Sequence, residues 1–201
     1  MRVLAIDQSM NATASVLMES NDDGKLTILS DDYYRPKCTG IYRLAGFKSW
    51  LNNTILTHKP DLLVRELHNQ VQYGAASQLQ AIGCILDIAA YNLGYMGTNN
   101  YCIIPVTTWK KFITGKGNLK KDTAYLVHIN KWLKSCKFFD IAKDVEYIDD
   151  NLADAICLGL TGYAAKRIQS DESIKATKQS LTDLRKSLKT IFDYGENEAK
   201  K

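Results

Sequence analysis

The chain has 201 residues, of which 45% are apolar and 24% are charged, and a formal net charge of +4, which fits one ordinary globular domain with an appendage. Its five cysteines are scattered and form no CxxC pair, so neither a disulfide framework nor a zinc ribbon is indicated, and we expect a reducing cytosol. We expect no membrane span and no signal peptide either, because no apolar run approaches about 18 residues and Asp7 and Gln8 interrupt the apolar N-terminal stretch.

The N-terminal part of the chain predicts three strands and a helix. Short apolar runs at residues 2–6, 13–18 and 25–29 are separated by polar turns, which is typical of an antiparallel meander. Helical spacing of apolar residues follows at 42–57. The helix is expected to end at Lys59-Pro60, because proline cannot continue it.

The middle of the chain predicts two further strands, each followed by helical sequence. Residues 61–66 are expected to form a strand buried on both faces, and residues 101–106 another. Helices are expected at residues 75–93, 107–114, 120–134 and 151–166. This order predicts an α/β fold, in which helices flank a five-stranded mixed sheet whose first three strands are antiparallel.

The C-terminal part has a different pattern. Its apolar positions step alternately by three and four residues, at Ile174, Leu181, Leu184, Leu188 and Ile191 with one polar intruder, Thr177. This is an a/d heptad pattern over about three heptads. It fits either a contact between two chains or an amphipathic helix that packs on its own domain. We therefore divide the chain into a domain of residues 1–168 and a helical extension of residues 169–201.

Four acidic residues lie beside strongly apolar segments. Asp7 and Glu66 each end a predicted strand, and Asp150 and Asp154 lie four residues apart at the start of the last helix of the domain. Singly, each has a plain structural explanation. Asp7 suits a turn and Glu66 an ion pair, whereas Asp150 or Asp149 suits a helix cap and Asp154 the positive end of the helix dipole.

Taken together, the four acids favour a shared metal site. Clustered carboxylates repel one another unless a cation neutralises them. Oxygen ligands without Cys or His partners select Mg²⁺, or Mn²⁺ in its place, rather than Zn²⁺. Two such ions about 4 Å apart would activate a water molecule and stabilise the leaving oxygen of a phosphodiester. The sequence thus predicts a metal-dependent nuclease.

The strand-ending Asp7, the strand-ending Glu66 and the segment DNLADAICL together resemble a RuvC-type Holliday junction resolvase of the ribonuclease H-like superfamily. The resemblance extends over roughly the first 165 residues, in order and in spacing. IDQS stands where the bacterial enzymes usually have IDPG, REL stands where IEQ is usual, and ADAICLGL resembles their ADALALA-type helix. These departures from the bacterial motifs suggest a phage or other viral member.

The resemblance implies a ribonuclease H-like fold and a fourth metal ligand at the start of the last domain helix. Bacterial members carry that acid three residues before the last Asp, where this chain has Asn151. Asp150 is the expected substitute, so that Asp7, Glu66, Asp150 and Asp154 are the expected catalytic and metal-binding acids. Asp149 and Asn151 remain alternatives for the fourth position.

A basic stretch precedes that helix. Residues 110–143 hold nine lysines and only two acids, an excess that can attract phosphate backbones, although a solvated helix surface is the commoner explanation. By the resemblance, Lys110 and Lys121 are the functional lysines, Lys121 with a catalytic role, and both contact the DNA backbone. The remaining candidates for DNA contact are Lys111, Lys116, Lys120, Asn69 and Tyr73. Trp109 is expected to pack in the core, with base stacking as the alternative because it directly precedes Lys110.

The expected function is symmetrical cleavage of four-way (Holliday) junctions, and of other branched DNA, by a homodimer with two metal ions in each active site. Dimer symmetry would match substrate symmetry. An alternative from another class is a non-catalytic branched-DNA-binding protein on the same fold. An actin-like or sugar-kinase-type nucleotide hydrolase is disfavoured, because the chain has no GxGxxG or GxxxxGK[ST] loop.

Overall fold

The computed structural model describes residues 1–9, 11–67, 75–118, 125–135, 149–170 and 178–192. Five strands form one sheet in the order β3-β2-β1-β4-β5. Their bounds are β1 Arg2–Asp7, β2 Thr13–Ser20, β3 Leu26–Tyr34, β4 Leu62–Leu67 and β5 Tyr101–Pro105. Strands β1, β2 and β3 pair antiparallel, whereas β4 pairs parallel with β1 and with β5. The predicted mixed five-stranded sheet is confirmed.

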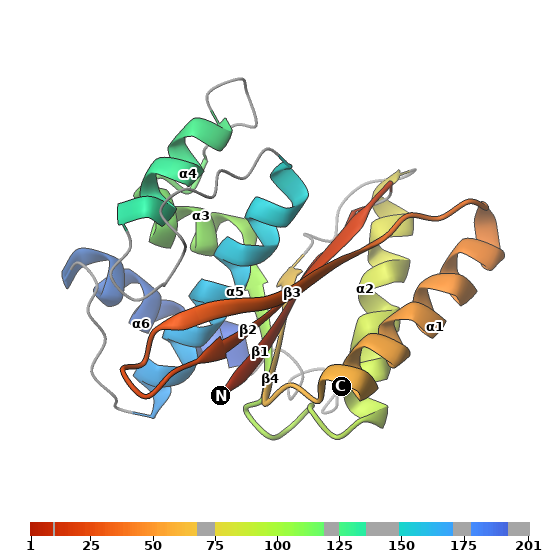
Figure 1. Ribbon diagram of the computed structural model, residues 1–201, viewed down its shortest axis with the longest axis horizontal. Coiled ribbons are helices and arrows are strands. Elements are labelled where there is room, and N and C mark those ends of the chain that lie inside the picture. Colours follow the sequence, from red (N-terminus) through yellow and green to blue (C-terminus); the bar gives the residue numbers. More distant parts are fainter. Residues whose placement is uncertain (10, 68–74, 119–124, 136–148, 171–177, 193–201) are drawn as a thin grey trace.

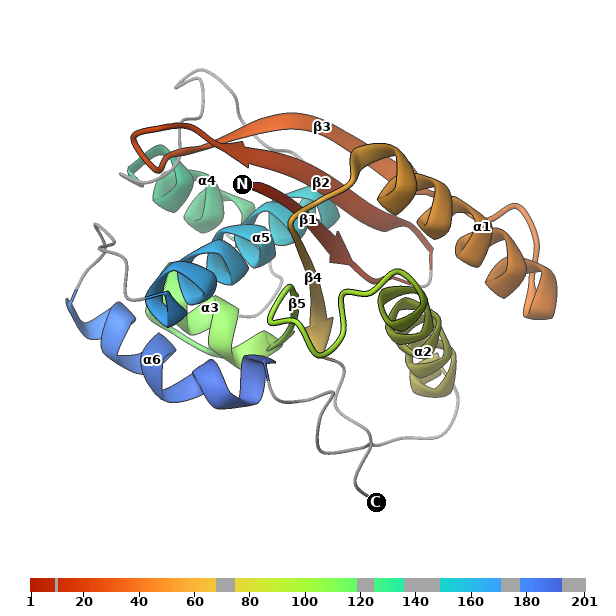
Figure 2. The same ribbon diagram turned by 90° about the horizontal axis from the view of Figure 1, so that it is seen from below.

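The helices have bounds close to those expected from the sequence. They are α1 Gly40–His58, α2 Ala75–Asn92, α3 Val106–Thr114, α4 Tyr125–Ser135, α5 Asp150–Gln169 and α6 Lys178–Phe192. Figures 1 and 2 show α1 and α2 on one face of the sheet and α3, α4, α5 and α6 on the other. No helix among the described residues combines the length and the apolarity that a bilayer span requires.

Alternation along the strands fixes which side chain faces which helical layer. Val3 and Ala5 of β1 belong to the core cluster beneath α5, whereas Leu4 and Ile6 belong to the cluster beneath α1 and α2. Successive strand residues point to opposite faces, so Asp7 follows Val3 and Ala5 toward α5. Gln8, the next residue, lies near Gly83 of α2, on the opposite side of the sheet.

Helix α5 lies unusually close to the sheet because two of its glycines meet strand side chains. A Cβ atom at Gly159 would lie 2.1 Å from Met18 Cε, and one at Gly162 would lie 2.6 Å from Val64 Cγ2. Real side chains do not tolerate such approaches. The sequence predicted one apolar stripe on this helix, but nearly all of it is buried, because α3, α4 and α6 pack around its far side.

The C-terminal helix α6 packs within the same chain, against β5, α3 and α5. Leu184 and Ile191 of the predicted heptad positions are buried in the core beneath α5. This contact matches the second interpretation of the heptad pattern, packing of the helix on its own domain. The heptad residues Ile174 and Thr177 lie outside the described residues.

Candidate active site at the carboxyl ends of β1 and β4

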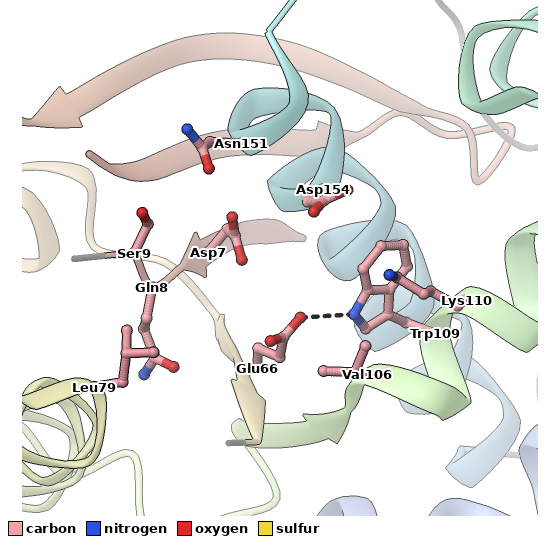
Figure 3. Close-up of a pocket in the computed structure, with 10 residues that line it drawn as sticks. All are labelled: Asp7, Gln8, Ser9, Glu66, Leu79, Val106, Trp109, Lys110, Asn151 and Asp154. Carbon is pink, nitrogen blue, oxygen red and sulfur yellow. Dashed lines mark hydrogen bonds between the residues drawn. The ribbon is translucent and has the colours of Figure 1, made fainter. Parts of the chain in front are cut away.

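A pocket of about 340 Å³ opens where β1 and β4 end beside the first turns of α5. Because β1 and β4 run parallel, their carboxyl ends meet at the same edge of the sheet. Figure 3 shows the lining residues, which are Asp7, Gln8, Ser9, Glu66, Leu79, Val106, Trp109, Lys110, Asn151 and Asp154. The pocket thus collects side chains from β1, β4, α2, α3 and α5.

Three of the four predicted acids line this pocket. Asp7 ends β1, Glu66 lies near the end of β4, and Asp154 lies on the first turns of α5. Their exposed fractions are only 6%, 8% and 3%. Residues 7, 66 and 154 are far apart in the sequence, so the tertiary fold alone brings these carboxylates around one cavity. Burying like charges together is costly unless cations offset them.

Two aromatic side chains donate hydrogen bonds to these carboxylates. Trp109 Nε1 donates to Glu66 Oε2 at 2.9 Å, and the Tyr125 hydroxyl donates to Asp154 Oδ1. Burial, and then the charge of Asp154, raise the pKa of Tyr125 far above its usual value. Tyr125 therefore stays protonated around neutral pH and keeps its donor role, which orients the Asp154 carboxylate.

Lys110 is the only cation among the described residues that line the pocket. It is buried, and its ammonium lies 5.5 Å from the centre of the Trp109 ring and 5.3 Å from that of the Tyr125 ring. Cation–π contact at such distances stabilises a charged ammonium in a partly dry site. The resemblance implies that Lys110 contacts the DNA backbone; the structure places Lys110 in the pocket with the acids, and the DNA contact stays a prediction.

The start of α5 separates the three candidates for the fourth ligand position. Asp149 is the N-cap, and its Oδ1 accepts from the backbone N–H groups of Asn151 at 2.9 Å and Leu152 at 3.1 Å. Asn151 lines the pocket together with Asp154, one helical turn further on. Asp150 is half-buried and is not among the described lining residues. Its catalytic role stays a prediction, and Asn151 offers a neutral oxygen at the same end of the helix.

The other predicted DNA contacts lie away from the acids or outside the described residues. Lys111 pairs with Asp183 of α6 at 3.0 Å, and Lys116 is exposed just beyond α3. Lys120, Lys121, Asn69 and Tyr73 fall outside the described residues, so the predicted catalytic role of Lys121 remains a prediction.

The donor set of the pocket fits a hard divalent cation. Carboxylate and amide oxygens converge there, without thiol or imidazole among the described lining residues, and such a set is typical of Mg²⁺ or Mn²⁺. Within the described part of the chain, no group of three or more His, Cys, Asp and Glu side chains stands ready to hold an ion. One oxygen of Glu66 and one of Asp154 accept from Trp109 and Tyr125, so these two aromatic donors orient both carboxylates.

Several residues of the site carried no clear signal in the sequence. Trp109 was expected to pack in the core; it is buried, but it also bonds Glu66. Tyr125 had no assigned role, and Gln8 was noted only as a polar interruption. The fact that Trp109 directly precedes Lys110 was the one available hint. Trp109 lies 43 residues from Glu66 in the sequence, and Tyr125 lies 29 residues from Asp154. Local sequence patterns carry no information about contacts at such separations.

The sheet order and the helices on both faces define a ribonuclease H-like fold. No family model matches the chain, and no curated protein is significantly similar to it in sequence. Among solved structures, Thermus thermophilus RuvC aligns with a TM-score of 0.64 at 14% identity, over 85% of this chain and 97% of that one. The same protein in complex with a Holliday junction substrate gives a TM-score of 0.65 at 14% identity, over 85% and 96%.

The yeast mitochondrial Holliday junction resolvase Ydc2 aligns with a TM-score of 0.57 at 15% identity, over 94% of this chain and 85% of that one. The chain therefore has the particular ribonuclease H-like architecture of the RuvC-type Holliday junction resolvases, as the sequence motifs predicted. At this level of identity the similarity concerns the fold, and the activity has to be argued from the pocket.

Proposed function

We propose that this protein is a metal-dependent endonuclease that resolves four-way DNA junctions. The observation that carries the proposal is the pocket in which Asp7, Glu66 and Asp154 meet although three separate elements supply them. A protein gains no stability from gathering buried carboxylates, so such a cluster indicates a functional site. The fold shared with RuvC and with Ydc2 makes branched DNA the first substrate to test.

In this proposal Asp7, Glu66 and Asp154 hold Mg²⁺ or Mn²⁺, and Asn151 or Asp150 completes the set. Bound there, the metal supplies Lewis acidity and a lowered pKa for an attacking water. Lys110 approaches a phosphate oxygen as a point charge, a role that suits an ammonium. Trp109 and Tyr125 hold the Glu66 and Asp154 carboxylates in place by donating hydrogen bonds to them, as outer partners of metal ligands commonly do.

The substrate proposal includes two chains acting together. A four-way junction has approximate two-fold symmetry, and paired cuts on opposed strands need two active sites related in the same way. We therefore propose a homodimer. Helix α6 buries Leu184 and Ile191 within its own chain, so this face of the helix would not contact the second chain.

The decisive experiment compares cleavage of a synthetic four-way junction, a replication fork and a plain duplex, with Mg²⁺, with Mn²⁺ and with chelator. We expect the wild-type protein to cut the junction with either metal and to stop with chelator. Asp154→Asn should bind the junction with unchanged affinity and leave it intact. Asp23→Asn is the matched control, because Asp23 is exposed in the turn between β2 and β3.

Two results would contradict the proposal. Wild-type protein that binds the junction but never cuts it would favour the non-catalytic branched-DNA-binding alternative. Undiminished cutting by Asp154→Asn would remove that carboxylate from the chemistry.

A further inference from the structure

Gln8 directly follows the first acid of the pocket and faces the other way. Asp7 follows Val3 and Ala5 toward α5, whereas the Gln8 amide lies near Gly83 of α2. Figure 3 shows the Gln8 amide beside Leu79 of α2, turned away from Asp154 and Asn151. Gln8 still lines the same pocket as the acids. It therefore occupies one end of the cavity, while the carboxylates and Lys110 occupy the other.

The Gln8 amide is buried without hydrogen bonds. The residue is 4% exposed, and among the described residues neither Nε2 nor Oε1 has a hydrogen-bond partner. Leaving both a donor and an acceptor unpaired in the interior destabilises the folded state. Buried polar groups are nearly always paired in native proteins, so an exception calls for an explanation.

The neighbours of Gln8 do not satisfy this amide. Arg65 also lies beside Gly83, but its guanidinium donates to the carbonyl oxygen of Glu66 at 2.8 Å and to Asp87 at 2.8 and 2.9 Å. Across from the amide stands Gly83 of α2. A Cβ atom there would lie 3.9 Å from Gln8 Nε2 and 3.7 Å from Arg65 Nη1. As a glycine, Gly83 has no side chain that could pair with the amide.

We propose that Gln8 and Leu79 form a nucleobase subsite, in which the Gln8 amide pairs with the edge of the base next to the scissile phosphate. This inference rests on the proposed nuclease function and adds a specificity-determining residue to it. A nucleotide has a phosphate for the charged end of the pocket and a base for the other. Leu79 supplies an apolar contact for the face of that base.

The chemistry of the amide favours a base over a second phosphate. A glutamine amide presents a donor beside an acceptor, and both are unpaired here. Phosphate oxygens only accept, so a phosphate would leave Oε1 without a partner. The edge of a base offers a donor beside an acceptor, and glutamine pairs in this way with adenine N6 and N7. One such pair discriminates between bases by about 5- to 150-fold.

The test uses four junctions that differ only in the base pair beside the cut, with single-turnover cleavage rates measured for each. Wild-type protein should prefer one base, by at least about fivefold over the poorest. Gln8→Met keeps the size of the side chain but removes its hydrogen bonds, so the four rates should converge to within about twofold. Gln80→Met on the exposed side of α2 is the matched control and should keep the wild-type preference.

A second measurement changes the DNA as well as the protein. An abasic nucleotide beside the cut should slow wild-type protein by about tenfold and Gln8→Met by clearly less, because the substitution has already removed the amide contact and only the Leu79 contact is left to lose. A wild-type preference that survives in Gln8→Met, equal rates for all four junctions with wild-type protein, or no effect of the abasic nucleotide would each overturn the inference. If wild-type protein cuts no junction at all, the proposed nuclease function itself fails, and the inference fails with it.

Discussion

Arg65 and Glu66 are consecutive residues of β4, and they face opposite layers of the molecule. On the α2 side, Arg65 donates to Asp87 at 2.8 and 2.9 Å and to the Tyr101 hydroxyl at 2.8 Å. Tyr101 in turn donates to Asp87 at 2.6 Å. The buried cation has a carboxylate beside it, so the charges balance locally.

On the α5 side the balance is different. Glu66 shares a pocket with Asp7 and Asp154, and the described lining residues include one cation, Lys110. Three buried carboxylates against one ammonium leave a negative excess that repels itself. The Arg65 network is neutralised within the chain, whereas the Glu66 pocket keeps a negative excess, which the proposed metal ions would offset. Four substitutions test this distinction, in order of their expected effect on cleavage.

Glu66→Gln should lower single-turnover junction cleavage by about 10³-fold or more, because it removes one charge from the metal-binding set. The amide oxygen of Gln can still accept from Trp109, so the fold should persist. Glu19→Gln on β2 is the matched control, since Glu19 pairs with Arg2 at the surface. Cleavage by Glu66→Gln at the control rate would rule out a ligand role for Glu66.

Lys110→Met should lower cleavage by about 10²-fold, because it removes the ammonium beside the carboxylates while keeping the buried stem. Lys111→Met is the comparison, since Lys111 is 53% exposed and pairs with Asp183, and we expect a change of less than about threefold. The same single-turnover assay measures both. If Lys110→Met and Lys111→Met lost cleavage activity equally, the pocket position of Lys110 would have no special role in cleavage.

Tyr125→Phe should lower cleavage by about tenfold and raise the Mg²⁺ concentration for half-maximal rate, because Asp154 loses the donor that orients it. Since the pKa of Tyr125 is raised, wild-type protein keeps this donor up to alkaline pH, and the tyrosine itself should add no pH dependence near neutrality. Tyr163→Phe removes a hydroxyl that donates to the Gly24 carbonyl at the far end of α5. If that control loses as much activity, the effect belongs to the helix as a whole.

Asp87→Asn should leave cleavage within about threefold of wild type and reduce stability instead. The substitution removes the negative charge that pairs with Arg65 and should lower the unfolding free energy by about 2 kcal/mol. The loss is smaller than for a fully buried pair because Asp87 is partly exposed. That loss corresponds to a Tm lower by about 4–8 °C. Thermal unfolding and cleavage measured on one preparation would separate the two layers. If Asp87→Asn lost cleavage but kept the stability of wild type, the Arg65 network would contribute to catalysis rather than to stability alone.

The sequence predicted the sheet, because apolar runs and turn residues reflect local preferences and burial. It also predicted Asp7, Glu66 and Asp154 around one site, since strand ends and the first turns of a helix have definite places in an α/β fold. The extent of β3 was underestimated: the expected strand ended at residue 29, but β3 continues to Tyr34. Its last residues pair with β2 although Asp31 and Asp32 are poor strand formers.

The donors to the acids were beyond the sequence for a physical reason. Trp109 and Tyr125 reach Glu66 and Asp154 through the packing of α3 and α4 against the rest of the domain, and no spacing rule predicts such contacts. The start of α5 was equally hard to assign. Each step of one residue along a helix turns a side chain by about 100°, so neighbouring positions have different roles: Asp149 caps the helix, and Asn151, two residues on, lines the pocket.

The three carboxylates of the pocket stand at positions 7, 66 and 154, and this has a consequence for synthesis. A ribosome delivers the N-terminal strands long before it delivers α5, so an incomplete chain has no means of assembling the pocket. If the pocket cuts DNA, a polypeptide that ends before α5 lacks Asp154 and would not cut. Cleavage would then be confined to chains in which α5 has been synthesised and has folded.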